Sequence, residues 1–160
     1  MAQTAKPMTI LGRDKETLVT IRRASADDAA QLAELSRQLG YPAQPEEMKQ
    51  RLERVRPDEE HALFVAERQG GGVVGWVHVF LYHSIENTTH TEVGGLVVDE
   101  RCRSQGVGHQ LLTRAEQWAR EKGCRAIGLR SNVIRERAHA FYEREGYRVI
   151  KTQKAFRKDL

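Results

Sequence analysis

The decisive stretch of this sequence is Leu96-Val97-Val98-Asp99-Glu100-Arg101-Cys102-Arg103-Ser104-Gln105-Gly106-Val107-Gly108, where an apolar segment runs through a basic loop into an amphipathic segment. Backbone N–H groups at the start of a helix have no intrahelical partners and lie at the positive end of the helix dipole, so they receive phosphate oxygens well. Gly106 and Gly108 lack a Cβ, which lets an anion approach the backbone closely. The order of strand, glycine loop and helix therefore predicts a phosphate-binding turn. The alternative is a surface loop that precedes a helix.

Two common phosphate-binding motifs do not fit this loop. A Walker loop needs G-x-x-x-x-G-K-[ST], and neither glycine is followed by Lys-Ser or Lys-Thr. A dinucleotide-binding turn needs G-x-G-x-x-G, and the third glycine is missing after Gly106-Val107-Gly108. What remains is R-x-x-G-x-G, formed by Arg103, Gly106 and Gly108. This pattern resembles the acetyl-CoA signature of the GNAT N-acetyltransferase superfamily.

Composition narrows the class of protein. A chain of 160 residues, 39% hydrophobic and 30% charged, is typical of one soluble globular domain. It has neither an apolar run long enough to cross a bilayer nor the apolar segment of a signal peptide, so we expect a cytoplasmic protein without a membrane partner. Cys102 and Cys124 form no C-x-x-C pair, so we expect no disulfide framework and no metal site. The net charge of +4 is spread along the chain without a nucleic-acid-binding motif, so we expect no nucleic acid partner.

The elements read from the sequence form a mixed α/β (α+β) domain. Residues 1–17 show no periodicity and are expected to be a flexible arm that precedes a single domain, residues 18–160. Strands are predicted at 18–22, 62–67, 73–83, 91–98, 125–131 and 147–156, and helices at 25–39, 45–55, 107–122 and 135–145. The predicted order is β-α-α-β-β-β-α-β-α-β. Gly94-Gly95 interrupts the apolar alternation of the fourth of these strands, which indicates a bulge or a close approach of the backbone.

A second segment strengthens the resemblance to GNAT proteins. Ser131-Asn132 and Ala138-His139-Ala140-Phe141-Tyr142-Glu143-Arg144-Glu145-Gly146-Tyr147 are similar to the second signature of that family, and the order of elements is similar to the GNAT acyl-CoA N-acyltransferase fold. The resemblance therefore covers nearly the whole chain. It implies acetyl-CoA as co-substrate.

The resemblance also implies a set of residues that bind acetyl-CoA. Leu96, Val97 and Val98 would hold the pantetheine arm through their backbone. The pyrophosphate would lie on the loop, and further contacts would come from the second signature. The loop residues are Arg103, Ser104, Gln105, Gly106, Val107 and Gly108, and the later residues are Asn132, Ala138 and Phe141.

Tyr142 and Glu92 are the candidates for acid and base. A tyrosine with a pKa of about 10 is protonated at neutral pH, and a departing thiolate with a pKa near 8.5 accepts its proton. The alternative for Tyr142 is a role in packing. Glu92 lies where related proteins carry a carboxylate that takes the amine proton directly or through water, and the alternative is a solvated side chain. His83, His90 or a water molecule are the other candidate bases.

The resemblance implies an N-acetyltransferase that moves an acetyl group from acetyl-CoA to a primary amine of a small molecule, by direct attack in a ternary complex. The alternatives are a protein or peptide N-acetyltransferase and a non-catalytic module that binds CoA. The 84–89 loop and the first two helices, with Tyr41, Glu46 and Glu47, are expected to wall the amine site. The last strand is a candidate for edge exchange in a homodimer.

Overall fold

The computed structural model describes residues 18–160, which fall into two compact units, residues 18–128 and 129–160. The expected flexible arm, residues 1–17, lies outside the described residues. Helices and strands together confirm the mixed α/β class.

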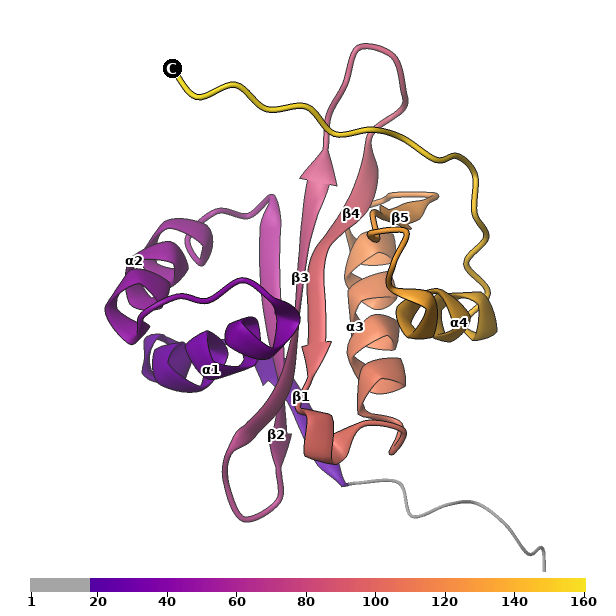
Figure 1. Cartoon of the computed structure of the whole chain (residues 1–160). Coiled ribbons are helices and arrows are strands. Elements are labelled where there is room, and N and C mark those ends of the chain that lie inside the picture. Colours follow the sequence, from indigo (N-terminus) through magenta and orange to yellow (C-terminus); the bar gives the residue numbers. More distant parts are fainter. Residues whose placement is uncertain (1–17) are drawn as a thin grey trace, which may run out of the picture. The chain divides into compact units, whose positions relative to one another are not determined.

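A five-stranded sheet organises the first unit. Its strands are β1 (Val19–Arg23), β2 (His61–Arg68), β3 (Val73–Tyr82), β4 (His90–Val98) and β5 (Ile127–Leu129), in the order β1-β2-β3-β4-β5 (Figure 1). Strands β1 to β4 pair antiparallel. In β3 the buried Val77 and Val79 alternate with Trp76, His78 and Phe80, as expected for a strand whose two faces have different surroundings.

Helices cover both faces of this sheet. Helices α1 (Ala29–Leu39) and α2 (Pro45–Val55) lie on one face, and α3 (Val107–Glu121) lies on the other (Figure 1). A short 3-10 helix, η1 (Ala26–Asp28), precedes α1, and η2 (Glu100–Cys102) precedes α3. Helix α1 ends at Gly40, whose φ of 95° is the left-handed conformation that glycine favours at a helix end. The helices bury apolar stripes at 0 to 2% exposure, with Leu32, Leu35 and Leu52 on α1 and α2 and Leu111, Leu112, Ala115 and Trp118 on α3.

The predicted bulge in β4 is confirmed. His78 pairs with Gly95 and Val79 pairs with Val93, so Gly94 is an extra residue with no partner on β3. Gly94 is exposed, whereas Val93 is buried. The bulge therefore leaves backbone open to solvent in the middle of an otherwise covered strand.

An ion network ties β1 to the start of the first helical segment. The Arg22 guanidinium donates to both carboxylate oxygens of Asp28, at 2.8 and 2.9 Å, and also to Glu67 on β2 at 2.9 Å. Asp28 accepts a further hydrogen bond from the backbone N–H of Ser25, at 2.7 Å. These bonds lower the pKa of Asp28, the one from Arg22 most strongly.

The second unit contains α4 (Glu136–Arg144), and here one sequence prediction is wrong. Residues 147–156 were expected to form a strand, but residues 147–160 have no regular secondary structure. Val149 and Ile150 are 75% and 79% exposed. A strand is stable only when its backbone groups pair with a neighbour, and this segment lacks such pairing in the structure. The order of elements therefore ends at α4.

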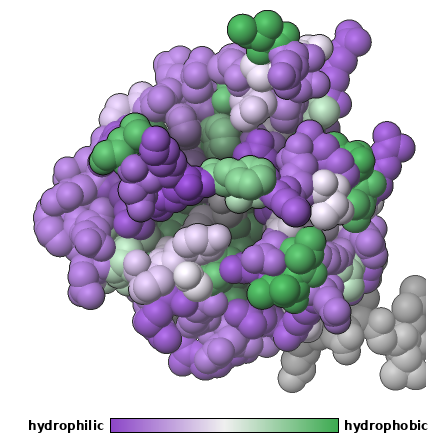
Figure 2. Space-filling view, turned by 45° about the horizontal axis from the view of Figure 1, so that its top comes forward, coloured by the Kyte–Doolittle hydropathy of each residue, from purple (hydrophilic) through white to green (hydrophobic). Residues whose placement is uncertain are grey.

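The face of the molecule in Figure 2 is mostly hydrophilic, and the hydrophobic residues on it are scattered among hydrophilic ones. Isolated apolar side chains on a surface are ordinary in proteins. Among the helices of residues 18–160, none is long and apolar enough to cross a membrane.

Candidate functional site

The glycine loop enters α3 through two residues with positive φ. Ser104 has a φ of 59° and Gly106, the residue that caps α3, has a φ of 81°. Helix α3 begins at Val107, as predicted, and Val107 is 1% exposed. The chain thus turns sharply and anchors the helix, and the first N–H groups of a 15-residue helix face out from the loop.

Two side chains of the loop bond back to the segment that precedes it. Arg103 donates from Nε to the backbone oxygen of Val98 at 3.2 Å, and Gln105 donates to the backbone oxygen of Arg101 at 3.2 Å. Asp99 caps η2 by accepting the Arg101 N–H at 2.9 Å. The position of the loop is therefore set by the end of β4.

Arg101 is paired with Asp99. Its guanidinium donates to both carboxylate oxygens at 3.0 Å, although the Arg101 side chain is 84% exposed. This hydrogen bonding is the main cause that lowers the pKa of Asp99 to about 2. The positive charge of Arg101 thus lies beside an anion at the loop.

Strand β4 carries the other predicted donor-site residues of this unit. Leu96 pairs with Val77 and Val97 pairs with Trp76, while Val98 pairs with Gly75. Val97 is 4% exposed, and Leu96 and Val98 are half-buried. Along the chain, the bulge at Gly94 is followed by these three residues at the end of β4 and then by the glycine loop.

Glu92 is buried next to His90. The carboxylate Oε2 lies 3.5 Å from Nε2 of His90, and the two side chains are 9% and 25% exposed. The ring of His90 also lies against Tyr82, with centroids 5.1 Å apart. A Cβ on Gly128 would lie 3.4 Å from Glu92 Oε2, so the small residue leaves room beside the carboxylate.

His83, a third candidate base, belongs to a different arrangement. Its Nδ1 lies 3.0 Å from Thr89 Oγ1 and its Nε2 lies 3.2 Å from Glu60 Oε1, so it ties the two ends of the 84–89 loop to the start of β2. Of the expected wall residues, Glu47 accepts the backbone N–H of Gln44 at 3.0 Å and Tyr41 is 67% exposed. In the part of the chain that the structure describes, no three His, Cys, Asp or Glu side chains are grouped to hold a metal ion.

The second unit holds the remaining predicted residues. Asn132 is exposed, and its Oδ1 accepts the Ile134 N–H at 3.2 Å while its backbone oxygen lies 3.0 Å from Nε2 of His139. Ala138 and Tyr142 are four residues apart on α4 and therefore share a helix face. Asn132 therefore closes a turn that precedes α4.

Tyr142 stands among aromatic rings. Its ring lies edge-on to Phe141 with centroids 5.2 Å apart, and the Tyr147 ring lies 5.9 Å away. Phe141 and Tyr142 are both half-buried. Burial raises the pKa of Tyr142 above its usual value of 10.0, so the hydroxyl stays protonated at neutral pH.

A pair of histidines in the first unit was not predicted from the sequence. His61 on β2 and His78 on β3 are 17 positions apart, and strand pairing brings their ring nitrogens within 3.0 Å. A polar residue between the buried Val77 and Val79 was a visible signal for His78 alone. The partner could not be identified without the register of β2 and β3.

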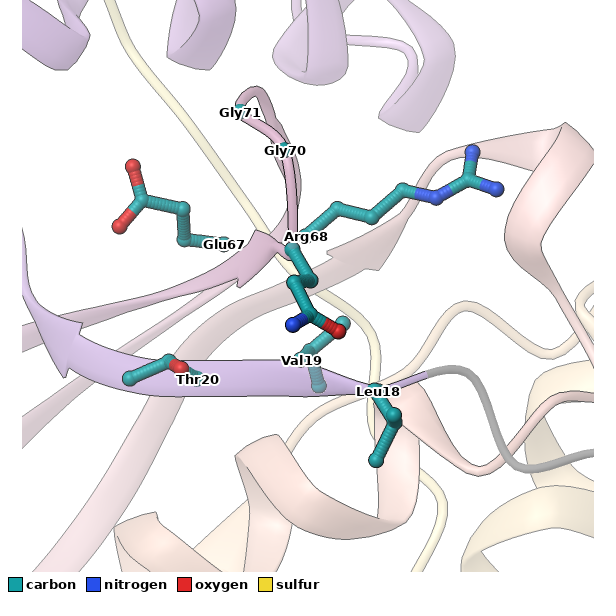
Figure 3. A pocket seen from close by; sticks show the side chains of 8 residues that line it. Leu18, Val19, Thr20, Glu67, Arg68, Gly70 and Gly71 are labelled. Atoms are coloured by element: carbon teal, nitrogen blue, oxygen red, sulfur yellow. The ribbon is translucent and has the colours of Figure 1, made fainter.

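A hollow lies elsewhere on the first unit. It has a volume of about 550 Å³ and is lined by Leu18 to Thr20 and by Glu67 to Gly71, on β1 and the β2–β3 turn (Figure 3). None of the predicted site residues lines it. The candidate site is therefore defined by β4 and its loop, and the hollow does not add to it.

The sequence of this chain is similar to those of known acetyltransferases. The family model described as the acetyltransferase (GNAT) family matches residues 29–147. The chain is 32% identical to aminoglycoside N(6')-acetyltransferase type 1 of Stenotrophomonas maltophilia over 145 residues, which cover 88% of this chain and 94% of that protein. It is 37% identical to the aminoalkylphosphonate N-acetyltransferase of Salmonella typhimurium over 81 residues, covering 50% and 53%.

A solved structure shows the same fold. The structure of AAC(6')-Iy in complex with the bisubstrate analogue CoA-S-monomethyl-acetylneamine superposes with a TM-score of 0.79, at 18% identity, and the match covers 89% of this chain and 99% of that one. At this identity the likeness concerns the fold alone. The predicted fold family is thereby confirmed.

Proposed function

The chain belongs to the GNAT acetyltransferase family and is an acyltransferase, and we propose that it moves an acetyl group from acetyl-CoA to a primary amine of a small molecule, by direct attack in a ternary complex. One observation carries this proposal: the bulged strand β4 leads straight into a glycine loop that caps α3. The first feature offers open backbone to a thioester, and the second offers N–H groups to a pyrophosphate. Relatives that acetylate aminoglycosides and aminoalkylphosphonates support a small amine as acceptor.

The donor would lie along β4 and the loop. Backbone groups of Leu96, Val97 and Val98 would bind the pantetheine arm, and the N–H groups from Arg103 to Gly108 would bind the pyrophosphate. The positive φ of Gly106 supports this role, because it turns the loop so that the start of α3 faces an approaching anion. Asn132, Ala138 and Phe141 of the second unit are also proposed as donor-binding residues.

The acceptor would lose its proton to Glu92. A primary amine is an ammonium ion at neutral pH and has no lone pair to attack with until one proton leaves. The buried Glu92 carboxylate would accept that proton, directly or through water, with His90 at 3.5 Å beside it. The amine nitrogen would then bond to the thioester carbon.

Tyr142 would supply the proton for the leaving group. When the C–S bond breaks, its electron pair stays on sulfur as a thiolate, which would take the Tyr142 hydroxyl proton. Burial raises the pKa of Tyr142, which supports this role because the hydroxyl keeps its proton across the neutral range. Tyr142 would regain a proton from solvent before the next cycle.

An assay of thiol release tests the proposal. The protein would be mixed with acetyl-CoA and a panel that contains an aminoglycoside, an aminoalkylphosphonate and a peptide with a free N-terminus. We expect CoA thiol to appear with a small amine. Release with the peptide alone would replace the proposal by peptide acetylation.

Thermal unfolding provides a second test that does not depend on the acceptor. A ligand that binds the folded state raises the melting temperature, so saturating acetyl-CoA should raise it by several degrees. A rise without thiol release from any amine would indicate a CoA-binding module. No rise would reject the donor itself.

A further inference from the structure

His61 and His78 form a hydrogen bond in the plane of both rings. Nδ1 of His61 lies 3.0 Å from Nε2 of His78, the centroids are 5.2 Å apart, and the ring planes differ by 13°. Two centroids can be no further apart than the N···N distance plus the two ring radii, and 5.2 Å almost reaches that limit. The rings therefore meet edge to edge, as a good N–H···N bond requires. Phe80 packs against both rings, with centroids 5.4 and 5.6 Å away.

One end of this pair reaches the surface. Nε2 of His61 lies 3.8 Å from Asp58 Oδ2, and the two side chains are 31% and 49% exposed. An anion at this position favours a proton on Nε2 of His61. Nδ1 of His61 is then the acceptor in the bond between the rings.

The other end faces the bulge of β4. A Cβ on Gly94 would lie 2.9 Å from Nδ1 of His78, so this nitrogen points at the place where the strand opens to solvent. Within residues 18–160, Nδ1 of His78 has no hydrogen-bond partner, since its ring bonds only through Nε2. Asp58, His61 and His78 thus form a row from the surface to the bulge.

His78 is a neutral imidazole at neutral pH. Burial and the nearby His61 lower its pKa to about 4. A neutral ring has one N–H and one lone pair. With Nε2–H donated to His61, the lone pair of Nδ1 is presented to the bulge.

We infer that Asp58, His61 and His78 are a proton relay that takes a proton from the acceptor amine at the Gly94 bulge and carries it to the surface. The inference rests on the proposed function. Glu92 pairs in register with Phe80, and residues directly opposite each other share a sheet face, so Glu92 and the relay lie on one face. An ammonium that becomes an amide loses two protons. Glu92 would take the first, and the relay would take the second.

The proton transfer leaves no lasting charge on the buried His78 ring. As the C–N bond forms, the attacking nitrogen becomes cationic. Its proton bonds to Nδ1 of His78, the electron pair of that N–H bond stays on the amine nitrogen, and the Nε2 proton of His78 passes to Nδ1 of His61. The positive charge then lies on His61 beside Asp58, and the Nε2 proton of His61 leaves to the carboxylate or to water. After the product leaves, a proton enters at Nε2 of His61, the Nδ1 proton of His61 passes back to Nε2 of His78, and the Nδ1 proton of His78 leaves to water at the exposed Gly94, which restores the starting state.

The variant His61→Gln separates a relay from a structural bond. A glutamine amide can still hydrogen-bond to His78, but it does not pass a proton along. Acid–base steps contribute about 10²–10⁴-fold to rates, so we expect kcat to fall at least about tenfold, with KM for the amine and acetyl-CoA within about twofold. Asp58→Asn should lower kcat in the same direction, and Asp27→Asn, at an exposed aspartate of η1, serves as control. Wild-type kcat in His61→Gln would overturn the relay.

Nitrogen NMR of the histidine rings tests the proton arrangement without any acceptor. We expect His61 and His78 to carry their protons on Nε2, and Asp58→Asn to change the His61 ring signals. A proton on Nδ1 of His78 would contradict the relay. If no amine in the panel causes release of the CoA thiol, the proposed function is rejected instead. The NMR measurement and the assay therefore distinguish failure of the relay from failure of the proposed function.

Discussion

Gly94 and His78 lie so close that a Cβ atom on Gly94 would be 2.9 Å from Nδ1 of His78 and 3.1 Å from Cε1 of Phe80. Contacts under 3.0 Å force a neighbour to move. The His78 ring is held by its bond to His61 and by Phe80 packing, so it has little freedom to retreat. The absence of a Cβ at Gly94 therefore leaves the space that the His78 ring needs in order to pair with His61.

The variant Gly94→Ala should disturb both stability and turnover. Overpacking of this kind costs about 1–3 kcal/mol of unfolding free energy, and displacement of the His78 ring should lower kcat. Denaturant unfolding and the thiol-release assay measure the two effects. Gly70→Ala is the control, because φ is +91° there and the space around it is open, so only backbone strain is added. Unchanged stability and kcat in Gly94→Ala would contradict the packing described here.

The glycine at the start of α3 should matter for the donor. Gly106→Ala places a Cβ on a residue with a φ of 81°, which costs about 1–2 kcal/mol and turns the loop away from its geometry. We expect acetyl-CoA to bind at least about tenfold more weakly by calorimetry. Gly123→Ala, at the other end of the same helix, has a similar φ of 76° and open space. Gly123→Ala should lose a similar unfolding free energy but bind acetyl-CoA with wild-type affinity. If both variants bound acetyl-CoA equally well, the loop would not be part of the donor site.

Tyr142→Phe should lower kcat and leave the donor bound. Loss of a general acid lowers rates by about 10²-fold or more, whereas the ring itself and its contacts with Phe141 and Tyr147 remain. Steady-state kinetics and acetyl-CoA binding separate the two quantities. Tyr147→Phe, in the same unit, is the matched control. A wild-type kcat in Tyr142→Phe would exclude the hydroxyl as acid.

Stability at low pH should depend on Asp28. The pKa of Asp28 is lowered in the folded state, chiefly by the hydrogen bonds from Arg22. The ionised carboxylate therefore stabilises the fold at any pH above the pKa that Asp28 has in the unfolded chain. This stabilisation is lost as the pH falls through the pKa of the folded state. Asp28→Asn should cost about 2 kcal/mol at pH 7, and the difference from wild type should shrink below about pH 4. Urea unfolding between pH 2 and 7 measures it. Asp27→Asn, with an exposed side chain, should follow wild type, and a constant difference for Asp28→Asn would refute the linkage.

Local signals in the sequence predicted most of the first unit. Gly40 ends α1 and Pro45 begins α2 as predicted, because each residue restricts the backbone by itself. The bulge at Gly94 was visible for the same reason. Such features need no knowledge of distant parts of the chain.

Features that depend on pairing could not be predicted in this way. The apolar residues at 147–150 are compatible with a strand, yet a strand exists only where a partner receives its hydrogen bonds. His61 and His78 each look ordinary in sequence, and only the register of β2 and β3 joins them. The roles of Glu92, Tyr142, Asn132, Ala138 and Phe141, a cytoplasmic location and a homodimer stay predictions.

The bulge also governs which side of the sheet each residue of β4 faces. Side chains alternate along a strand, and one inserted residue reverses the parity of everything that precedes it. With Gly94 present, Glu92 pairs with Phe80 and Val93 with Val79. If Gly94 paired with Val79 instead of bulging, Glu92 would lie opposite Leu81 and point to the face of the buried Val77 and Val79, and Val93 would replace it on the face of the histidines. The bulge therefore keeps Glu92 on the face of the histidines: a chain without Gly94 would hold the same pairs in a regular strand, whereas pairing of Gly94 with β3 would turn Glu92 to the other face.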